Sequence, residues 1–379
     1  MNISTCLGAL KEIELTKAAY EHFRRVYPTE ELCISINNDL PTFEWAVATA
    51  ITDKNFKYDW TEPPISFSEN YNKAVALATK EKIVLYHNDM VPATGFLEKL
   101  DKNNDPMAVL GYTTIEPPVF KDHERPGKIV QDFGNEFSDF KVKEFEDYCK
   151  TIIEKLQPGA FFFLSCFKKT FDFLGGFDEK TFWPAFCEDD DFLLRLLHYG
   201  CDLQTTNAAL VYHFVSRTSR FSNVPEIVWN QSTGSVEFNS QRNFIRKWGN
   251  RYLGYMNKKV GVFDIGYNLK YANHSIIQSL EPFARNLVVD CKINDYITNE
   301  QSRTNFDLQS KFVDTLTNQI TVHVDCNKLN QHTFTHLVNL PVLLSALKDS
   351  GTFKYGEFEI NVTGVPVNLV DSLIVIERK

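Results

Sequence analysis

The sequence predicts an α/β protein with a mostly parallel central sheet, followed by a second, smaller domain. Strand and helix patterns alternate through the first 100 residues with short links between them, which favours parallel strands joined by helical crossovers. Polar clusters directly follow two of these strands, at residues 37–39 and 87–89. The pattern changes after about residue 257. We therefore expect one domain over 1–257 and another, of α/β or α+β type, over 258–379.

The elements of the first hundred residues follow from hydrophobic periodicity. Short apolar runs predict strands, and apolar positions at helical spacing between charged residues predict helices. Ser68 is placed to cap the third helix. In chain order we expect strand 3–7, helix 10–26, strand 32–36, helix 42–52, an extended segment 55–67, helix 69–79 and strand 82–86.

The rest of the first domain is expected to be less regular. Residues 117–142 are polar and contain proline, which is typical of a long functional loop. Around this loop the patterns predict strand 107–112, helix 143–156, strand 159–163, helix 168–174, helix 188–199 and strand 208–214. In the second domain, residues 319–324 and 371–376 have strand patterns.

Charge and cysteine content argue against several classes of protein. Lys and Arg number 40 against 49 Asp and Glu, a net charge of −9, and the scattered basic residues do not form the basic patch that nucleic acid requires. No stretch approaches the roughly 18 apolar residues of a transmembrane helix. The eight cysteines form no CxxC pair, and the N-terminus lacks a signal-peptide pattern. We therefore expect a cytoplasmic protein, whose oligomeric state the sequence does not indicate.

The cluster His87-Asn88-Asp89 directly follows the strand expected at 82–86. Side chains at the carboxyl end of a parallel strand lie where α/β sheets bind ligands. A carboxylate there can bind a divalent cation, which can bridge and neutralise a diphosphate. A solvated turn is the structural alternative.

His213 stands near the end of the strand expected at 208–214. A single histidine is more often structural, yet neutral imidazole is a common metal ligand. Arg217 follows a few residues later, where its guanidinium can face a diphosphate. The pattern allows a second metal ligand and a cationic donor contact in this segment.

The acidic run Glu188-Asp189-Asp190-Asp191 lies between two apolar segments. Four successive carboxylates suit a helix N-terminus, where the macrodipole favours them, so capping is the structural alternative. The apolar flanks predict partial desolvation, which raises a carboxylate's affinity for a proton and suits a general base. In a helix, residues 188 and 191 share a face whereas 189 points elsewhere. We therefore expect these acids to have different roles.

Taken together and in order, these motifs resemble the large family of inverting glycosyltransferases with the GT-A fold, a Rossmann-like fold. The resemblance covers about residues 1–250. Residues 68–89 resemble the family's helix and strand that end in its DxD-type metal motif, and residues 186–196 resemble its ExD-containing acidic motif. The other matching segments are 159–182, with its GGFDE turn, 211–214, with the late metal-ligand histidine, and 242–249.

The resemblance implies an enzyme that transfers a hexosyl group, with inversion, from a nucleotide-diphosphate sugar to an acceptor hydroxyl. It implies Mn²⁺ or Mg²⁺ as cofactor, with Asp89 as the main ligand, His87 in place of the motif's first acid and His213 as a second ligand. Asp189 would be the general base, and Glu188 or Asp191 would position the acceptor. The donor-binding residues would be Asn37, Asn38, Asp39, Asn72, Lys73, Asn88, Gly159 and Arg217.

Several alternatives stay open. The sequence names neither the sugar nor the nucleotide, and the acceptor can be a glycan, a lipid-linked glycan or a protein. The family commonly has Asp where Asn37 stands. The alternative function is a catalytically weak or inactive sugar-binding or scaffold protein with a GT-A-like domain.

Other enzyme classes fit less well. A nucleotidyltransferase generally carries a Gly-rich, basic phosphate loop after its first strand, and the residues after Cys6 are a poor match. The second domain faintly resembles the late strands of a methyltransferase but has no Gly-rich cofactor loop. We therefore expect the second domain to serve packing or acceptor recognition.

Overall fold

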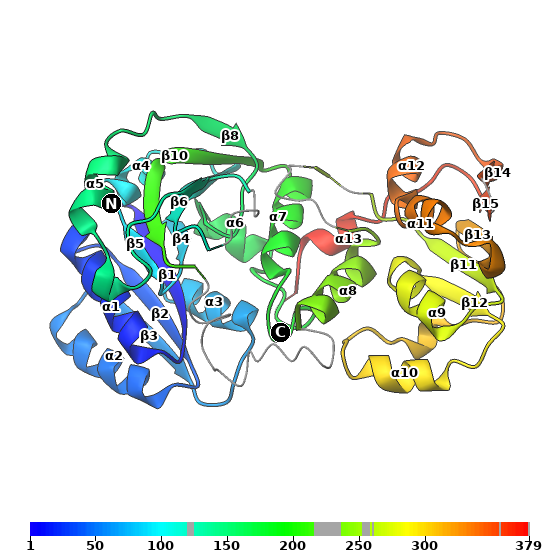
Figure 1. Cartoon of the computed structure of the whole chain (residues 1–379), viewed down its shortest axis with the longest axis horizontal. Helices are drawn as coiled ribbons and strands as arrows, with labels where there is room; N and C mark the ends of the chain where they lie inside the picture. The colour runs from blue at the N-terminus through cyan, green and yellow to red at the C-terminus, as the bar shows by residue number, and fades with distance from the viewer. Residues whose placement is uncertain (120–124, 216–235, 252–257, 260, 356–357, 378–379) are drawn as a thin grey trace.

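The larger lobe is built on one mixed sheet whose N-terminal half is parallel (Figure 1). The computed structural model describes residues 1–119, 125–215, 236–251, 258–259, 261–355 and 358–377. Within them the sheet has the order β3-β2-β1-β4-β9-β6-β10-β5, with β7 beside β6 and β8 beside β10. The strands are β1 (Ile3–Leu10), β2 (Leu32–Asn37), β3 (Phe56–Thr61), β4 (Lys82–Tyr86), β5 (Met90–Pro92), β6 (Ala108–Glu116), β7 (Lys128–Val130), β8 (Leu156–Pro158), β9 (Leu164–Phe167) and β10 (Asp202–His213).

Strand direction brings several carboxyl ends to one edge of this sheet. Strands β3, β2, β1 and β4 pair in parallel, and β9 lies antiparallel between β4 and β6. Strand β6 therefore runs in the direction of β4, and β10 pairs with β6 in parallel. The carboxyl ends of β4, β6 and β10 thus share the edge at which α/β sheets bind ligands.

The helices of the larger lobe begin and end close to their predicted positions in the first hundred residues. The helices are α1 (Ile13–Val26), α2 (Leu40–Thr52), α3 (Phe67–Ala76), α4 (Phe96–Asp101), α5 (Val142–Cys149), α6 (Lys168–Phe173), α7 (Glu188–Tyr199) and α8 (Val236–Trp248), with a 3₁₀ turn η1 at Phe137–Asp139. One hydrophobic core includes Ile34 of β2, Leu85 of β4 and Leu194 of α7, and a second cluster joins Phe145 of α5 to Tyr212 of β10. The sheet edge that carries the site is therefore held by apolar packing.

The smaller lobe has its own sheet and its own core (Figure 1). Its strand order is β12-β11-β13-β15-β14, so the expected α/β class with a second, smaller sheet is confirmed. The strands are β11 (Ile265–Lys270), β12 (Asn286–Val289), β13 (Ile320–Asp325), β14 (Gly351–Tyr355) and β15 (Phe358–Val362). The helices are α9 (His274–Leu280), α10 (Asn294–Gln301), α11 (Gln331–Val338), α12 (Leu340–Ala346) and α13 (Asp371–Ile374), with 3₁₀ turns η4 (Glu281–Phe283), η5 (Gln309–Lys311) and η6 (Cys326–Lys328).

Some predicted elements are wrong, each for a local reason. Ser66, not Ser68, caps α3, since its hydroxyl accepts from the backbone N–H of Glu69 at 3.0 Å. Residues 159–163 precede β9 instead of forming a strand, because a short apolar run does not distinguish a strand from a buried loop. The expected loop at 117–142 also contains β7 and η1.

The C-terminal segment corrects a further prediction. Residues 371–376 were expected to form a strand, but α13 is a helix that packs against α7 of the larger lobe. Leu373 and Ile374 contact the core of the larger lobe, and the Ile376 N–H donates to the Leu174 carbonyl at 3.1 Å. The apolar pattern therefore reflects packing against the larger lobe and not a place in the smaller sheet. The domain limits 1–257 and 258–379 stay a prediction.

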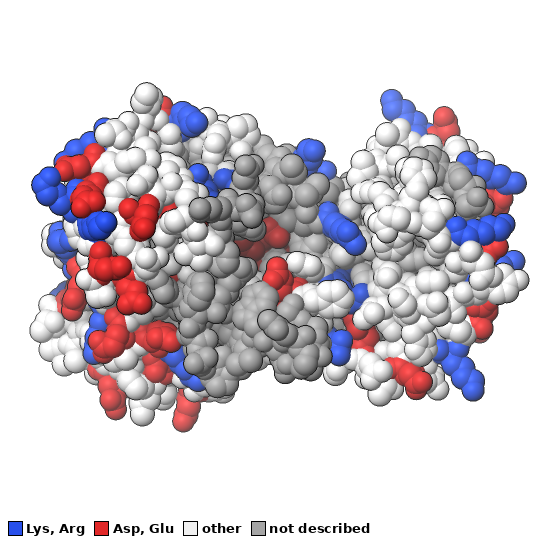
Figure 2. All heavy atoms as spheres, viewed as in Figure 1, with Lys and Arg blue, Asp and Glu red and all other residues white. Residues whose placement is uncertain are grey.

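The surface is of mixed charge. Figure 2 shows acidic and basic side chains interspersed over both lobes on the face that it presents. In the part of the chain that the structure describes, every helix is too short or too polar to cross a lipid bilayer. All eight cysteines are free thiols.

A buried ion-pair network ties α8 to the smaller lobe. Arg246 of α8 donates to Glu281 at 2.7 Å and to Glu300 at 2.6 Å, and Lys311 donates to Glu281 at 2.5 Å. Arg242 of α8 donates to Glu300 at 2.7 Å. Burial opposes the ionisation of Glu281, but Lys311 and Arg246 outweigh it and lower the pKa of this carboxyl to about 2. Charges buried in this way hold the two lobes together only while each has its partner.

We expect Glu281→Ala to lower the free energy of unfolding by about 3–5 kcal/mol, because Arg246 and Lys311 lose their buried counter-charge. Urea denaturation followed by tryptophan fluorescence measures the change. The control, Glu14→Ala, removes an 85% exposed partner of Lys17 and is expected to cost less than about 1 kcal/mol. Similar losses in the two variants would contradict this role of the network.

Candidate functional site

The pairing of β5 with β10 fixes the centre of the site. His87 and Asp89 lie in the turn that follows β4, and Met90 begins β5. In the antiparallel β5–β10 ladder Met90 lies opposite His213, and the N–H of Phe214 donates to the carbonyl of Asp89 at 2.9 Å. Two segments more than a hundred residues apart are thus aligned by backbone hydrogen bonds. Their side chains meet at the carboxyl edge of the sheet.

His87, Asp89 and His213 form a cluster suited to a metal ion. The Oδ1 atom of Asp89 lies 3.3 Å from His213 Nε2 and 3.8 Å from His87 Nδ1, and one ligand atom from each residue falls within 4.8 Å of the others. Ligands bonded at roughly 2.0–2.2 Å to one ion lie roughly 3–4 Å apart. Among the described residues, the buried Nε2 atom of His87 has no hydrogen-bond partner, and the Nε2 atom of His213 faces the Asp89 carboxylate. The residues therefore fit a divalent cation.

Glu116, which the sequence analysis did not identify, supports the cluster from behind. It ends β6, and its Oε1 lies 3.0 Å from His213 Nδ1. A carboxylate that accepts from one imidazole nitrogen orients the other toward a metal and makes it a stronger ligand. Arg125 donates to the same carboxylate at 2.5 Å. A polar residue at the end of a strand is the signal that identified His87 and Asp89. Glu116 was missed because the strand predicted at 107–112 stopped four residues before it.

Charges around the cluster set its protonation. Burial lowers the pKa of His87 to about 4, so its imidazole is neutral near pH 7. Burial also disfavours charge on His213, but the carboxylates of Asp89 and Glu116 outweigh it and raise its pKa to about 9. Burial also disfavours the charged form of Glu116, but His213 and Arg125 outweigh it and hold the pKa of this carboxyl well below its usual range. The two carboxylates therefore favour positive charge at this position, and a cation bound there would replace the proton on His213.

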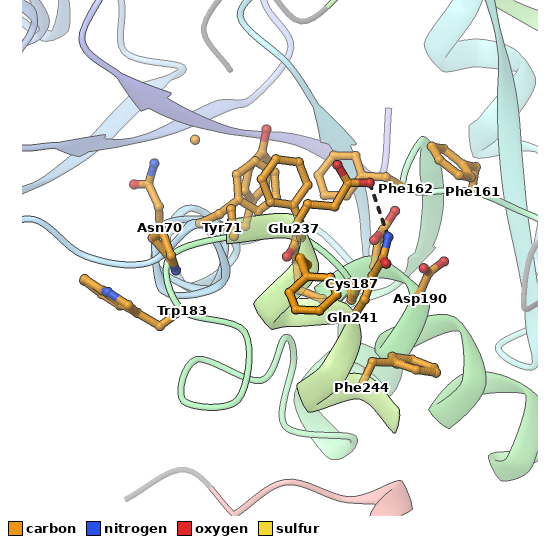
Figure 3. A pocket seen from close by; sticks show the side chains of 18 of the residues that line it. Asn70, Tyr71, Phe161, Phe162, Trp183, Cys187, Asp190, Glu237, Gln241 and Phe244 are labelled. Atoms are coloured by element: carbon orange, nitrogen blue, oxygen red, sulfur yellow. Dashed lines mark hydrogen bonds between the residues drawn. The ribbon is translucent and has the colours of Figure 1, made fainter. Parts of the chain in front are cut away.

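A cavity of about 1170 Å³ opens beside this cluster and is lined by both lobes. Figure 3 shows side chains that line it from several segments, among them Tyr71, Phe162, and Glu237 and Gln241 of α8, which are joined by a hydrogen bond. The predicted site residues that line the cavity are Asn37, His87, Asn88, Asp89, Glu188, Asp189 and His213. Those described but absent from its lining are Asn38, Asp39, Asn72, Lys73, Gly159 and Asp191. Arg217 lies outside the described residues.

The acids at the start of α7 form another wall of the cavity. Glu188 is 6% exposed, and within the described chain its Oε2 has no hydrogen-bond partner. Burial raises the pKa of Glu188, Asp189 and Asp190, and mutual repulsion adds to the effect for Glu188 and Asp190. A desolvated carboxylate that faces a cavity is suited to proton transfer. The partial burial expected from the apolar flanks is therefore observed.

Asp191 has different surroundings from its three neighbours. Its side chain is fully buried and accepts from Arg195 Nε at 2.8 Å and from Trp248 Nε1 at 2.9 Å. Lys247 Nζ lies 2.6 Å from it. These contacts connect α7 to α8 and leave Asp191 out of the cavity lining, whereas Glu188, which was expected to share its helix face, lines the cavity together with Asp189.

The residues predicted to bind the donor are mostly engaged in structural contacts. The Asn37 amide donates to the Ile65 carbonyl at 2.7 Å and accepts from the Ile65 N–H at 3.0 Å. Asn72 makes the same reciprocal contacts with the backbone of Phe177, each at 2.9 Å. Lys73 lies 3.5 Å from Asp59. These side chains hold the loops around the cavity in place.

Gly8 and Asn70 also line the cavity, and the sequence analysis named neither. A Cβ atom on Gly8 would lie 2.9 Å from Asn70 Nδ2 and 2.9 Å from Tyr71 Cε2, so any side chain would force its neighbours apart. The Oδ1 of Asn70 is buried and, in the described structure, accepts no hydrogen bond. Gly8 of β1 thus makes room for the side chains of Asn70 and Tyr71, and Asn70 offers one acceptor atom.

No protein-family model matches the chain, and no curated protein matches it. Three solved structures show a partial likeness. GalNAc-T7 with UDP, GalNAc and Mn²⁺ has a TM-score of 0.42 at 8% identity over 56% of this chain and 42% of that one. The mannosyltransferase PcManGT from Pyrobaculum calidifontis with GDP-Man and Mn²⁺ has a TM-score of 0.41 at 17% identity, over 57% of this chain and 58% of that one. S. aureus TarS has a TM-score of 0.41 at 12% identity, over 57% of this chain and 37% of that one. The chain therefore matches less than two thirds of each.

We expect Glu116→Gln to weaken Mn²⁺ binding by about 10–100-fold, because the carboxylate that orients His213 is lost. Isothermal titration calorimetry measures the Kd, and circular dichroism checks that the variant is folded. Asp89→Ala is expected to abolish binding, whereas His323→Gln, on β13 of the smaller lobe, leaves the Kd unchanged. A folded Glu116→Gln protein with the wild-type Kd would rule out this positioning role.

Proposed function

We propose that the protein is a metal-dependent glycosyltransferase that uses a nucleotide-sugar donor. One observation carries the proposal: a His-Asp-His cation site and a row of desolvated carboxylates line the same cavity. Transfer of a sugar from a nucleoside diphosphate needs positive charge for the leaving diphosphate and a base for the acceptor hydroxyl. The two groups of side chains supply these functions from different walls.

The cation we propose is Mn²⁺. Two of the three ligands are imidazoles, and Mg²⁺ prefers an all-oxygen octahedral shell with several waters. When bound, the ion neutralises the negative charge that develops on the leaving diphosphate. Arg125, which lines the cavity, and Lys128, whose Nζ lies 3.6 Å from Glu116, add positive charge at the same end.

The nucleoside is proposed to lie over the carboxyl ends of β1 and β2. Asn70 Oδ1, beside Gly8, is available to accept a hydrogen bond from a base or ribose. Asn37 holds the backbone at Ile65, which lines the same end of the cavity. This orientation directs the sugar toward α7.

The proposed chemistry is a single in-line displacement. Asp189 removes the proton of the acceptor hydroxyl while the oxygen attacks the anomeric carbon from the face opposite the diphosphate. The carbon–oxygen bond to the diphosphate breaks, and the anomeric configuration inverts. Because burial and the neighbouring acids raise the pKa of Glu188, a protonated Glu188 can donate a hydrogen bond and orient the acceptor.

A thermal-shift screen of UDP-, GDP- and dTDP-sugars tests the donor class. A ligand at 100 times its Kd stabilises the native state by about 2.7 kcal/mol, so one nucleotide type is expected to raise the Tm. The increase is expected only with Mn²⁺ and is expected to disappear in Asp89→Ala. A shift that persists in EDTA would contradict a metal-bridged diphosphate.

We expect Asp189→Asn to lower kcat for transfer about 10²–10⁴-fold, because the variant cannot accept the hydroxyl proton. The neighbouring substitution Asp190→Asn is the matched control and is expected to retain most of the activity. Since burial raises the pKa of Asp189 and the base acts as a carboxylate, wild-type kcat should fall as the pH drops through this pKa. Transfer with a wild-type rate and pH profile in Asp189→Asn would remove the base assignment.

The catalytically weak sugar-binding alternative gives a different result in the same assay. Release of nucleoside diphosphate from the donor, with Mn²⁺ and without acceptor, reports turnover directly. A protein that binds the donor but releases no diphosphate with or without acceptors would be a binding protein.

A further inference from the structure

The smaller sheet has a topological switch point of its own. Strand β11 lies between β12 and β13, and both pair with it in parallel. The chain leaves β11 through α9 toward β12, whereas β13 leads through α11 and α12 to β14 and β15 on the opposite side. Connections that diverge in this way leave a crevice beyond the carboxyl ends of the two strands, where open α/β sheets bind ligands.

A second cavity, of about 250 Å³, lies at this switch point. Ser275, Ile276 and Ser279 of α9 form one wall, and Leu329, Gln331 and Phe334, after β13, are on the other. Its lining within the described chain contains no charged side chain. The structure therefore has a cavity at the switch point, where the topology predicts one.

The two cavities adjoin, since Ser279 and Phe334 line both of them. The large cavity itself forms a groove that runs from the acids of α7 to the smaller lobe. Gln278 and Phe283 line the large cavity between these ends. The large cavity alone, at about 1170 Å³, exceeds the roughly 300–1,000 Å³ of a site for one small ligand. There is room for a donor and an extended second substrate.

The lining of the groove on the smaller lobe favours an uncharged sugar chain. A sugar ring has an apolar C–H face and a rim of hydroxyls. The half-buried Phe334 offers a surface for the face, and Ser275, Ser279 and Gln331 offer neutral hydrogen-bonding groups for the rim. Arg242, the basic side chain that α8 contributes, is paired with Glu300 at 2.7 Å, and Arg251, after α8, is the next basic residue of the lining. A phosphate-rich or acidic polymer would require several free cations.

We propose that the groove binds an uncharged oligosaccharide acceptor, whose terminal hydroxyl lies at Asp189 and whose preceding sugar units extend across Phe334. This inference rests on the proposed transferase function for the role of the terminal hydroxyl. The buried ion pairs of Arg242 and Arg246 hold the smaller lobe against α8, so the distance between the two ends of the groove is set by the scaffold. Acceptor affinity therefore depends on chain length.

Saturation-transfer NMR with neutral gluco-, manno- and rhamno-oligosaccharides of one to six units tests binding without requiring activity. We expect longer chains to bind more tightly and Phe334→Ala to weaken their binding by roughly 2–10-fold, the value of one aromatic stacking contact. The control is Tyr271→Ala, which removes a 62% exposed aromatic from the same lobe. It is expected to leave binding unchanged.

Kinetics distinguish this inference from the transferase proposal. Donor hydrolysis with Mn²⁺ and no acceptor reports the transferase site alone, and Phe334→Ala is expected to leave it unchanged while it raises the acceptor KM. Oligosaccharide binding that depends on Phe334, without donor hydrolysis, would support the acceptor groove and contradict the transferase proposal. Donor hydrolysis with no oligosaccharide binding, or with binding that Phe334→Ala does not alter, would contradict the acceptor groove.

Discussion

The antiparallel pairing of β5 with β10 is the constraint on which the site depends. It places Met90 opposite His213 and thereby sets Asp89 beside the His213 imidazole at 3.3 Å. A shift of one residue in this register would turn every side chain of β5 to the other face of the sheet and separate the ligands. Because β6 and β10 run in parallel, the same edge also receives Glu116. The cluster of His87, Asp89 and His213 is thus a consequence of strand direction and register.

Helix α8 connects this edge with the rest of the cavity. Through Trp248 and Lys247 it holds Asp191 of α7, so the first turn of α7 is anchored by one acid and presents the others to the cavity. Through Arg242 and Arg246 it holds the smaller lobe. A single helix therefore sets the relative positions of the carboxylates and the second lobe, and the buried ion pairs make that arrangement costly to disturb.

Much of the site was predictable from local patterns. The apolar run 82–86 correctly placed a strand before His87 and Asp89, and the apolar flanks of the α7 acids correctly indicated their desolvation. Glu116 was missed because the expected strand ended too early, although a polar residue at a strand end was the same signal. Gly8, Asn70 and the contributions of the smaller lobe depend on contacts between distant segments, which periodicity does not contain. For the same reason the apolar pattern at 371–376 was mistaken for a strand.

The central claim is that one cation is held by His87, Asp89 and His213 in the cavity that the α7 acids also line. Anomalous diffraction at the manganese edge, from crystals grown with MnCl₂, tests it most directly. The account predicts one strong anomalous peak within bonding distance of all three side chains, with Asp189 facing the same cavity. A peak bound elsewhere, with these three side chains unliganded, would contradict it.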